Sequence, residues 1–266
     1  MTPGPADLPA FAPPRRPGPD AAPDVVAHVR QLMGMPISIH VRGPAARSPR
    51  VASAIEAAYD DLAWVEATFS RWRPESELSR LRRGELTVAE CSRDMEQVLD
   101  LCDDFGVRTG GAFLHVLPDE ATGEWLLDPT GLVKGWAIAR AADILRRLDG
   151  HAHCVNAGGD IAVGGVADGP AGDRPWRLGI EDPDVPGTIA RIVELHDGGL
   201  ATSGCAARGA HLVDPATGER RLRRGSVSVL APDIISADAW ATALFVGPPG
   251  LDERIVRRPG WRVIRL

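Results

Sequence analysis

The sequence predicts an α+β fold in which mixed, largely antiparallel sheets are flanked by helices. Two observations support this prediction. Between residues 153 and 195, short segments of alternating apolar and polar residues follow one another, as in consecutive antiparallel strands. Longer segments elsewhere carry apolar residues three and four positions apart, which is typical of amphipathic helices. At least three helices should therefore cover the sheets in one compact unit.

Length and composition limit the possible classes of protein. The chain has 266 residues, of which 44% are hydrophobic and 25% charged, an ordinary globular balance. Its net charge of −6 produces no overall positive field that would attract nucleic acid. The arginine clusters at 80–83 and 220–224 contain no interleaved aromatic residues on which bases could stack. No apolar run approaches the roughly 20 residues of a membrane span. We therefore expect neither a nucleic-acid-binding nor a membrane-spanning protein.

The N-terminal segment differs from the rest of the chain. Residues 1–23 include eight prolines, a composition that favours a disordered tail, so residues 24–266 are predicted to form a single domain. No basic region followed by an apolar stretch marks a secretory signal. The four cysteines show no C-x-x-C spacing, which suits a reduced protein. These features predict a cytoplasmic location.

The first half of the domain reads as a strand followed by two helices. A turn at Met33-Gly34 leads into a strand with Ile37, Ile39 and Val41 on one face. The spacing of apolar residues predicts a helix over 51–69. A polar loop with a short helical turn follows over 70–81, and a second helix over 92–105 should stop near Gly106.

The middle of the chain contains two glycine-containing segments that can meet a ligand. Residues 128–135 lead into a helix that ends at Gly150, and Lys134 beside Gly135 at its N-terminus can contact a phosphate. The alternative is a surface lysine. Residues 157–165 join two strands through paired glycines, which make either a hairpin turn or a close backbone approach to a dinucleotide. The spacing is not G-x-G-x-x-G, so a Rossmann site is not supported.

The last part of the chain carries a candidate metal site. Strands are predicted over 176–183, 190–195, 226–230 and 261–266. Ser236 can cap a helix in which Asp238 and Thr242, four residues apart, share one face. A carboxylate and a hydroxyl are oxygen ligands for a hard cation such as Mg²⁺. The alternative is a helix in which Asp238 favours the positive end of the dipole and Thr242 packs.

The ordered set of motifs resembles the ApbE-type FAD:protein FMN transferase family. Each motif is weak alone, but together and in this order they are specific, and they extend from Met33 to Phe245. They are Met33-Gly34-Met35-Pro36, Phe69-Ser70-Arg71-Trp72, Ser76-Glu77-Leu78-Ser79, Gly110-Gly111-Ala112-Phe113, Lys134-Gly135, Ala157-Gly158-Gly159-Asp160, Ile180-Glu181-Asp182-Pro183, Thr202-Ser203-Gly204, the segment 211–218 that begins with His211, and Ala237-Asp238-Ala239-Trp240-Ala241-Thr242.

The resemblance implies an ApbE-like fold, a reaction and a set of site residues. Family members bind FAD and Mg²⁺, transfer FMN to a threonine of an acceptor protein through a phosphoester, and release AMP. By resemblance, Asp238, Thr242 and the backbone carbonyl of Gly131 are metal ligands. His211 would lie near the transferred phosphate as a catalytic residue together with Asp238 and Thr242. The residues lining FAD would be Met35, Trp72, Lys134, Ala157, Gly158, Gly159 and Asp160.

Two departures from the family pattern keep alternatives open. Leu114 and Ala139 stand where the family usually carries aspartate. The alternatives to transfer are hydrolysis of FAD to FMN and AMP, with water in place of threonine, and flavin binding without turnover.

Overall fold

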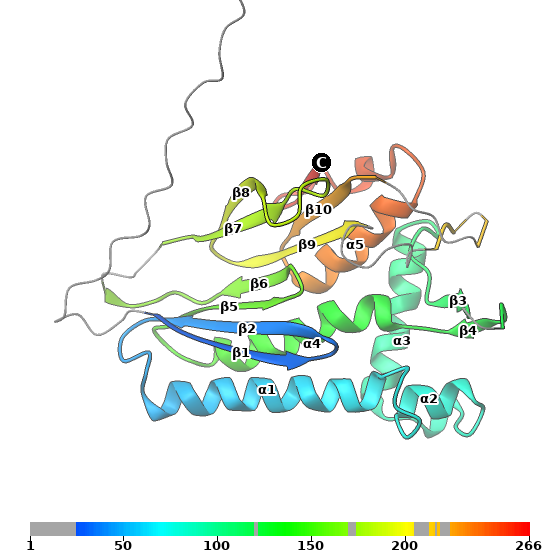
Figure 1. Ribbon diagram of the computed structural model, residues 1–266, viewed down its shortest axis with the longest axis horizontal. Helices are drawn as coiled ribbons and strands as arrows, with labels where there is room; N and C mark the ends of the chain where they lie inside the picture. The colour runs from blue at the N-terminus through cyan, green and yellow to red at the C-terminus, as the bar shows by residue number, and fades with distance from the viewer. Residues whose placement is uncertain (1–24, 120–121, 170–173, 205–212, 216, 219–223) are drawn as a thin grey trace, which may run out of the picture.

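The computed structural model describes residues 25–119, 122–169, 174–204, 213–215, 217–218 and 224–266. Its main feature is a seven-stranded sheet in the order β1-β2-β5-β6-β9-β10-β11, in which every neighbouring pair is antiparallel. Figure 1 shows β1, β2, β5, β6, β9 and β10 side by side in this order. The strands are β1 Val25–Leu32, β2 Met35–Arg42, β5 Ala152–Ala157, β6 Asp160–Gly164, β9 Gly198–Gly204, β10 Ser226–Ala231 and β11 Arg262–Arg265. The predicted α+β class is confirmed.

Helices cover one face of this sheet. The main core joins one side of the central strands, including Val155, Ala162, Ala201 and Val229, to the long helices. The helices are α1 Pro49–Phe69, α2 Glu77–Arg82, α3 Arg93–Arg108, α4 Thr130–Arg146 and α5 Ile234–Val246, with short 3-10 turns at Val88–Glu90 and Leu251–Arg254. Because α4 and α5 lie on the same face and contact each other, side chains from both can meet.

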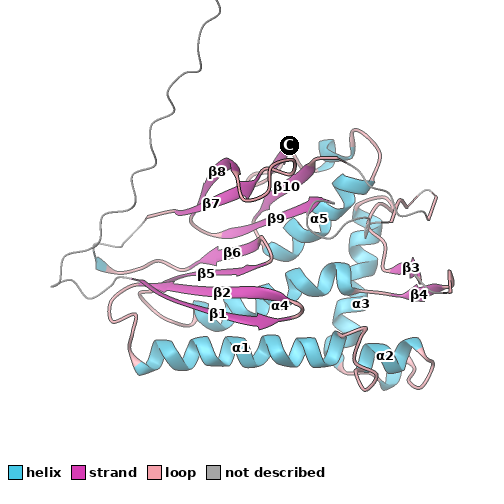
Figure 2. Cartoon of the chain, in the orientation of Figure 1, coloured by secondary structure: helices cyan, strands magenta, loops and turns pink. Residues whose placement is uncertain are grey.

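Two small hairpins complete the fold. The hairpin of β7 Trp176–Glu181 and β8 Ile189–Leu195 covers the other face of the sheet through a second core that includes Leu178, Ile180 and Val193. The hairpin of β3 Val116–Pro118 and β4 Trp125–Leu127 lies with α2 at one end of the molecule, as Figure 2 shows. None of the helices in the described part of the chain combines the length and apolar character of a membrane span.

Several helix boundaries differ from the sequence prediction. The second predicted helix does not stop near Gly106 but continues to Arg108, because Thr109 forms its C-cap. Helix α4 begins at Thr130, so Lys134 lies in its second turn instead of at its N-terminus. Asp233, and not Ser236, is the N-cap of α5: the Ser236 amide donates to the Asp233 carboxylate at 2.7 Å. The stretch 198–204, where the sequence analysis predicts no element, is β9, an interior strand between β6 and β10.

Candidate active site

Three charged side chains, two of them buried, meet where α4 and α5 approach the start of β6. Asp238 lies on α5, Lys134 on α4, and Asp160 is the first residue of β6. The Lys134 ammonium forms a close ion pair with Asp160 Oδ2 and lies 3.7 Å from Asp238 Oδ1. Both carboxylates are almost fully buried. We call Lys134, Asp160 and Asp238 the charged cluster; its net charge with all three groups ionised is −1.

Glycine permits this close approach of the two helices. The Gly135 amide donates to Asp238 Oδ2 at 2.9 Å. A Cβ at position 135 would lie 2.9 Å from Asp238 Cβ and 3.2 Å from the carbonyl oxygen of Ile234. Any larger residue here would therefore separate α4 from α5 and displace the carboxylate.

Asp160 positions Lys134. One carboxylate oxygen of Asp160 accepts the backbone N–H of Thr202 on β9 at 3.0 Å, and the other pairs with the ammonium. Asp160 was predicted to line FAD, but in this structure both of its oxygens contact protein groups. Lys134 is the only lysine in the chain, and the other 29 of the 30 Lys and Arg residues are arginine. A compact ammonium fits between two carboxylates where a planar guanidinium would not, so this composition is a sequence signal for the site.

The environment of Asp238 favours a nearby positive charge. Burial, the largest influence, raises the pKa of the Asp238 carboxyl group above its usual range; Lys134 opposes this rise and Asp160 adds to it. A buried carboxylate of this kind is stabilised in its ionised form by a cation beside it. The charged cluster therefore suits a polar ligand with positive charge of its own, such as a metal ion.

Thr242 lies one helical turn beyond Asp238, as the four-residue spacing predicted. Its hydroxyl is 3.2 Å from the hydroxyl of Ser203 on β9. Ser203 has no role in the sequence prediction, although the motif Thr202-Ser203-Gly204 was part of the resemblance. The pairing of β9 with β10 places this motif beside α5, which the sequence alone does not reveal.

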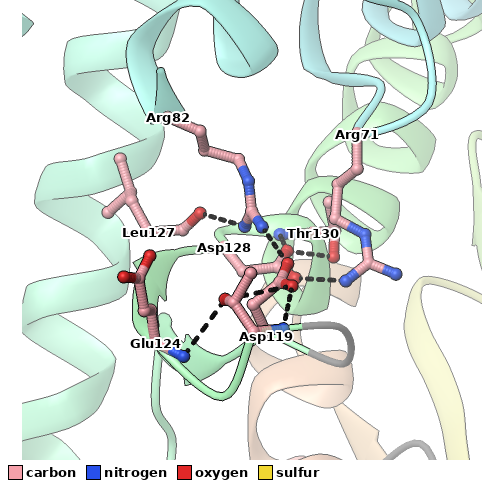
Figure 3. Close-up of polar contacts among 8 residues, drawn as sticks. Arg71, Arg82, Asp119, Glu124, Leu127, Asp128 and Thr130 are labelled. Carbon is pink, nitrogen blue, oxygen red and sulfur yellow. Dashed lines mark hydrogen bonds and ion pairs between the residues drawn. The ribbon is translucent and has the colours of Figure 1, made fainter. Parts of the chain in front are cut away.

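The first turn of α4 is anchored by a network of arginines and aspartates that the sequence prediction missed (Figure 3). Buried Asp128 accepts from the Arg71 guanidinium at 2.7 Å and from the Thr130 amide at 3.1 Å. Asp128 thereby caps α4, since Pro129 at the N-cap position makes no side-chain hydrogen bond. Arg82 adds bonds of 2.7 Å to the Leu127 carbonyl and 2.9 Å to Asp119. The network fixes the residues next to Gly131.

The remaining predicted flavin-lining residues lie around the same end of the sheet. Gly158 and Gly159 form the two-residue turn between β5 and β6, both with positive φ, so the hairpin interpretation is confirmed. Met35 begins β2, two residues from Ile37, which pairs with Ala157. The side chain of Ala157 lies in the core, so only its backbone can face a ligand.

Trp72, another predicted flavin-lining residue, is a largely exposed tryptophan. It is 80% exposed, and the guanidinium of Arg71 lies 5.1 Å from the centre of its ring. Through Arg71 and Asp128, Trp72 is connected to the start of α4 near Gly131. An exposed indole at this place can stack on a planar ligand.

The donor atoms of the site fit a magnesium ion. Asp238 offers a carboxylate and Thr242 a hydroxyl, and Gly131 is exposed in the first turn of α4. These are the hard oxygen donors that Mg²⁺ prefers. Among the described residues, no three His, Cys, Asp or Glu side chains gather into a metal-binding group, so a metal here would depend on hydroxyl, carbonyl or water oxygens as well. His211 lies outside the described residues.

Comparisons with known proteins agree with the predicted family. The ApbE family model matches residues 33–116 and 119–264. An FAD:protein FMN transferase of Salmonella typhimurium is 30% identical over 171 residues, which cover 60% of this chain and 46% of that protein. One from Vibrio cholerae is 34% identical over 134 residues, covering 46% of this chain and 39% of that protein. The matched stretches thus span less than half the length of these relatives.

Two solved structures share the fold. The ApbE protein of Thermotoga maritima superposes with a TM-score of 0.74 at 22% identity, covering 91% of this chain and 94% of that one. The flavin transferase ApbE of Vibrio cholerae superposes with a TM-score of 0.68 at 23% identity, covering 91% of this chain and 96% of that one.

Proposed function

The chain belongs to the ApbE family, and on this premise we propose that it transfers FMN from FAD to a threonine side chain of an acceptor protein, with Mg²⁺ as cofactor. The hydroxyl oxygen of the threonine attacks the phosphorus atom on the FMN side of the pyrophosphate. The bond from that phosphorus to the bridging oxygen breaks, and AMP leaves. The products are a phosphoester-linked FMN and AMP.

The observation that carries this proposal is the charged cluster with Thr242 one turn away. Phosphoryl transfer depends mainly on positioning and on neutralising charge around the phosphorus. The Lys134 ammonium, held by Asp160, supplies a fixed positive charge for phosphate oxygens. Asp238 and Thr242, with the Gly131 carbonyl, would hold Mg²⁺, which when bound acts as a Lewis acid on those oxygens.

Other residues of the chain orient the substrates. Trp72 stacks on the isoalloxazine ring, and Met35 and the turn at Gly158-Gly159 line the flavin. A threonine hydroxyl is a weak nucleophile and needs a base; His211 takes its proton near neutral pH. The names of the relatives, which are FAD:protein FMN transferases, support this assignment.

The test is intact-mass spectrometry of threonine-containing acceptor proteins after incubation with the full chain, FAD and Mg²⁺, with AMP followed in parallel. We expect an FMN adduct and an equal amount of AMP. An acceptor whose threonine is changed to valine is the matched control and should stay unmodified. Asp238→Asn should lose both products.

The alternative reactions give different results in the same experiment. AMP and free FMN without an adduct on any acceptor would replace the transferase by an FAD hydrolase. Bound FAD with neither product would leave a flavin-binding protein and refute both reactions.

A further inference from the structure

A cavity lies at the opposite end of the main sheet from the charged cluster. It has a volume of about 200 Å³, and its lining includes Arg42, Arg146 and Arg174. Gly165, which also lines it, follows the last residue of β6, whereas Asp160 is the first. At about 3.3 Å per residue, the five residue steps from Asp160 to Gly165 separate the two places by roughly 16 Å. The cavity is therefore distinct from the site at Asp238.

Two of the three arginines, Arg42 and Arg174, have no acidic partner among the described residues. Arg146 pairs with Asp197, another lining residue, at 3.0 Å. In the part of the chain that the structure describes, neither Arg42 nor Arg174 forms an ion pair with a carboxylate. Arginine stays protonated in proteins, so the cavity has two positive charges that no described carboxylate pairs with.

Arg42 is held rigidly but incompletely bonded. Its guanidinium lies 4.6 Å from the centre of the Trp176 ring, and one of its terminal nitrogens donates to the backbone carbonyl of Arg174. Its Nε is buried and has no hydrogen-bond partner among the described residues. A buried donor without a partner destabilises the folded chain until an acceptor reaches it. Burial and, after it, the charge of Arg174 lower the pKa of Arg42, which is the expected result of two cations brought together.

We propose that this cavity binds a small tetrahedral oxyanion, such as inorganic phosphate or sulfate, between Arg42 and Arg174. Guanidinium groups match the geometry of such oxyanions and form charge-assisted hydrogen bonds with them. A bound dianion would neutralise both unpaired charges. The cavity is smaller than the roughly 300–1,000 Å³ of pockets for larger organic ligands, which favours a free ion over the phosphate group of a nucleotide.

The proposal is tested by calorimetric titration of inorganic phosphate into the full chain, with ionic strength held constant by sodium chloride. The wild type should bind phosphate, and Arg174→Gln should weaken this binding at least tenfold. Arg174 is exposed, so this variant should fold even if Arg42→Gln does not. Arg177→Gln is the matched control, because Arg177 is an exposed arginine of β7 that does not line the cavity, and its affinity should equal that of the wild type.

A second variant separates this cavity from the charged cluster, where phosphate can also bind. Lys134→Gln should leave the Arg174-dependent binding unchanged. The proposal is overturned if the wild type binds no phosphate, if Lys134→Gln abolishes all binding, or if Arg177→Gln weakens binding as much as Arg174→Gln. AMP titrated into Lys134→Gln should bind at least tenfold more weakly than phosphate; tighter binding would refute the choice of a free ion.

Discussion

The backbone amide of Gly135 donates a hydrogen bond to Oδ2 of Asp238 at 2.9 Å. In a regular α-helix this amide would donate to the carbonyl of Gly131, four residues earlier. Gly135 thus orients one proposed metal ligand, the Asp238 carboxylate, from the helical turn that begins at another, the Gly131 carbonyl.

Gly135→Ala should lower the free energy of unfolding by about 1–3 kcal/mol, because the new methyl group overpacks the contact between α4 and α5. It should also weaken Mg²⁺ binding. Urea unfolding measures the first effect and titration with Mn²⁺ monitored by EPR the second. The control is Gly106→Ala in α3, where the nearest atom to a new Cβ is 3.6 Å away. There the better helix propensity of alanine should stabilise the chain by about 0.5–1 kcal/mol; equal effects at both positions would contradict the steric argument.

Lys134→Met should make the stability of the chain more dependent on pH. Without the ammonium, the pKa of Asp238, already raised by burial, rises further beside Asp160. A carboxyl group whose pKa is raised on folding stabilises the folded state at low pH and loses that contribution as pH rises. Burial already raises the pKa of Asp238 to about 7 in the wild type, so the destabilisation of the variant relative to the wild type should grow as pH rises above about 7, as measured by urea unfolding.

The charge-preserving control for that experiment is Lys134→Arg. Its positive charge near both carboxylates should remove most of the extra pH dependence. It should not restore FAD turnover, since a planar guanidinium does not place that charge on phosphate oxygens as the compact ammonium does. Wild-type turnover in Lys134→Arg would show that only charge matters at this position.

His153 should make the chain less stable in mild acid. It is 1% exposed, both ring nitrogens lack partners among the described residues, and burial, followed by the charge of Arg146, lowers its pKa to about 4. The unfolded chain binds a proton near its ordinary pKa of about 6.5, whereas the folded chain does not. Stability should therefore fall as pH decreases from about 6.5 towards 4, by on the order of 3 kcal/mol. In His153→Gln the midpoint of urea unfolding should depend less on pH over this range than in the wild type. If the midpoints of both proteins change with pH in parallel, His153 is not the source of the pH dependence.

Asp128→Ala should destabilise the chain more than Asp128→Asn. The alanine variant removes both the cap on Thr130 and the partner of Arg71, whereas asparagine keeps an acceptor for the cap. We expect the free energy of unfolding, measured with urea, to fall by about 2–4 kcal/mol in Asp128→Ala and by about 1–2 kcal/mol in Asp128→Asn. Both variants are destabilised because each leaves Arg71 without its carboxylate partner. Both variants should also weaken FAD binding, because Trp72 and the first turn of α4 lose their common anchor. The same loss in both variants would show that the cap contributes nothing.

Trp72→Ala should weaken FAD binding at least tenfold while changing the free energy of unfolding by less than about 0.5 kcal/mol, because the side chain is largely exposed. Quenching of flavin fluorescence measures the binding. Trp72→Phe should recover most of the affinity through stacking. Trp64→Ala, which removes a tryptophan packed on Phe69, is the opposite control and should affect stability but not affinity.

Local patterns in the sequence determined much of the fold. The helix at 51–69, the hairpin around Gly158-Gly159 and the pair β7–β8 follow from periodicity and turn residues, which depend on neighbours along the chain. The four-residue spacing of Asp238 and Thr242 likewise predicted that both lie on one face of a helix. The strand β9 was missed because its residues Gly198–Gly204 are small and lack alternation, and it is held by its neighbours β6 and β10.

The tertiary structure decided which charged groups meet. Asp160 and Asp238 are 78 residues apart, and no spacing rule links Arg71 to Asp128 or Arg42 to Arg174. Sheet register and the packing of α4 on α5 bring these groups together. Burial then raises the pKa of Asp238 and lowers that of Arg42, since only the folded chain removes water from around them. The sequence by itself therefore determined most of the elements and the family, whereas β9 and the contacts that make a site depend on long-range packing.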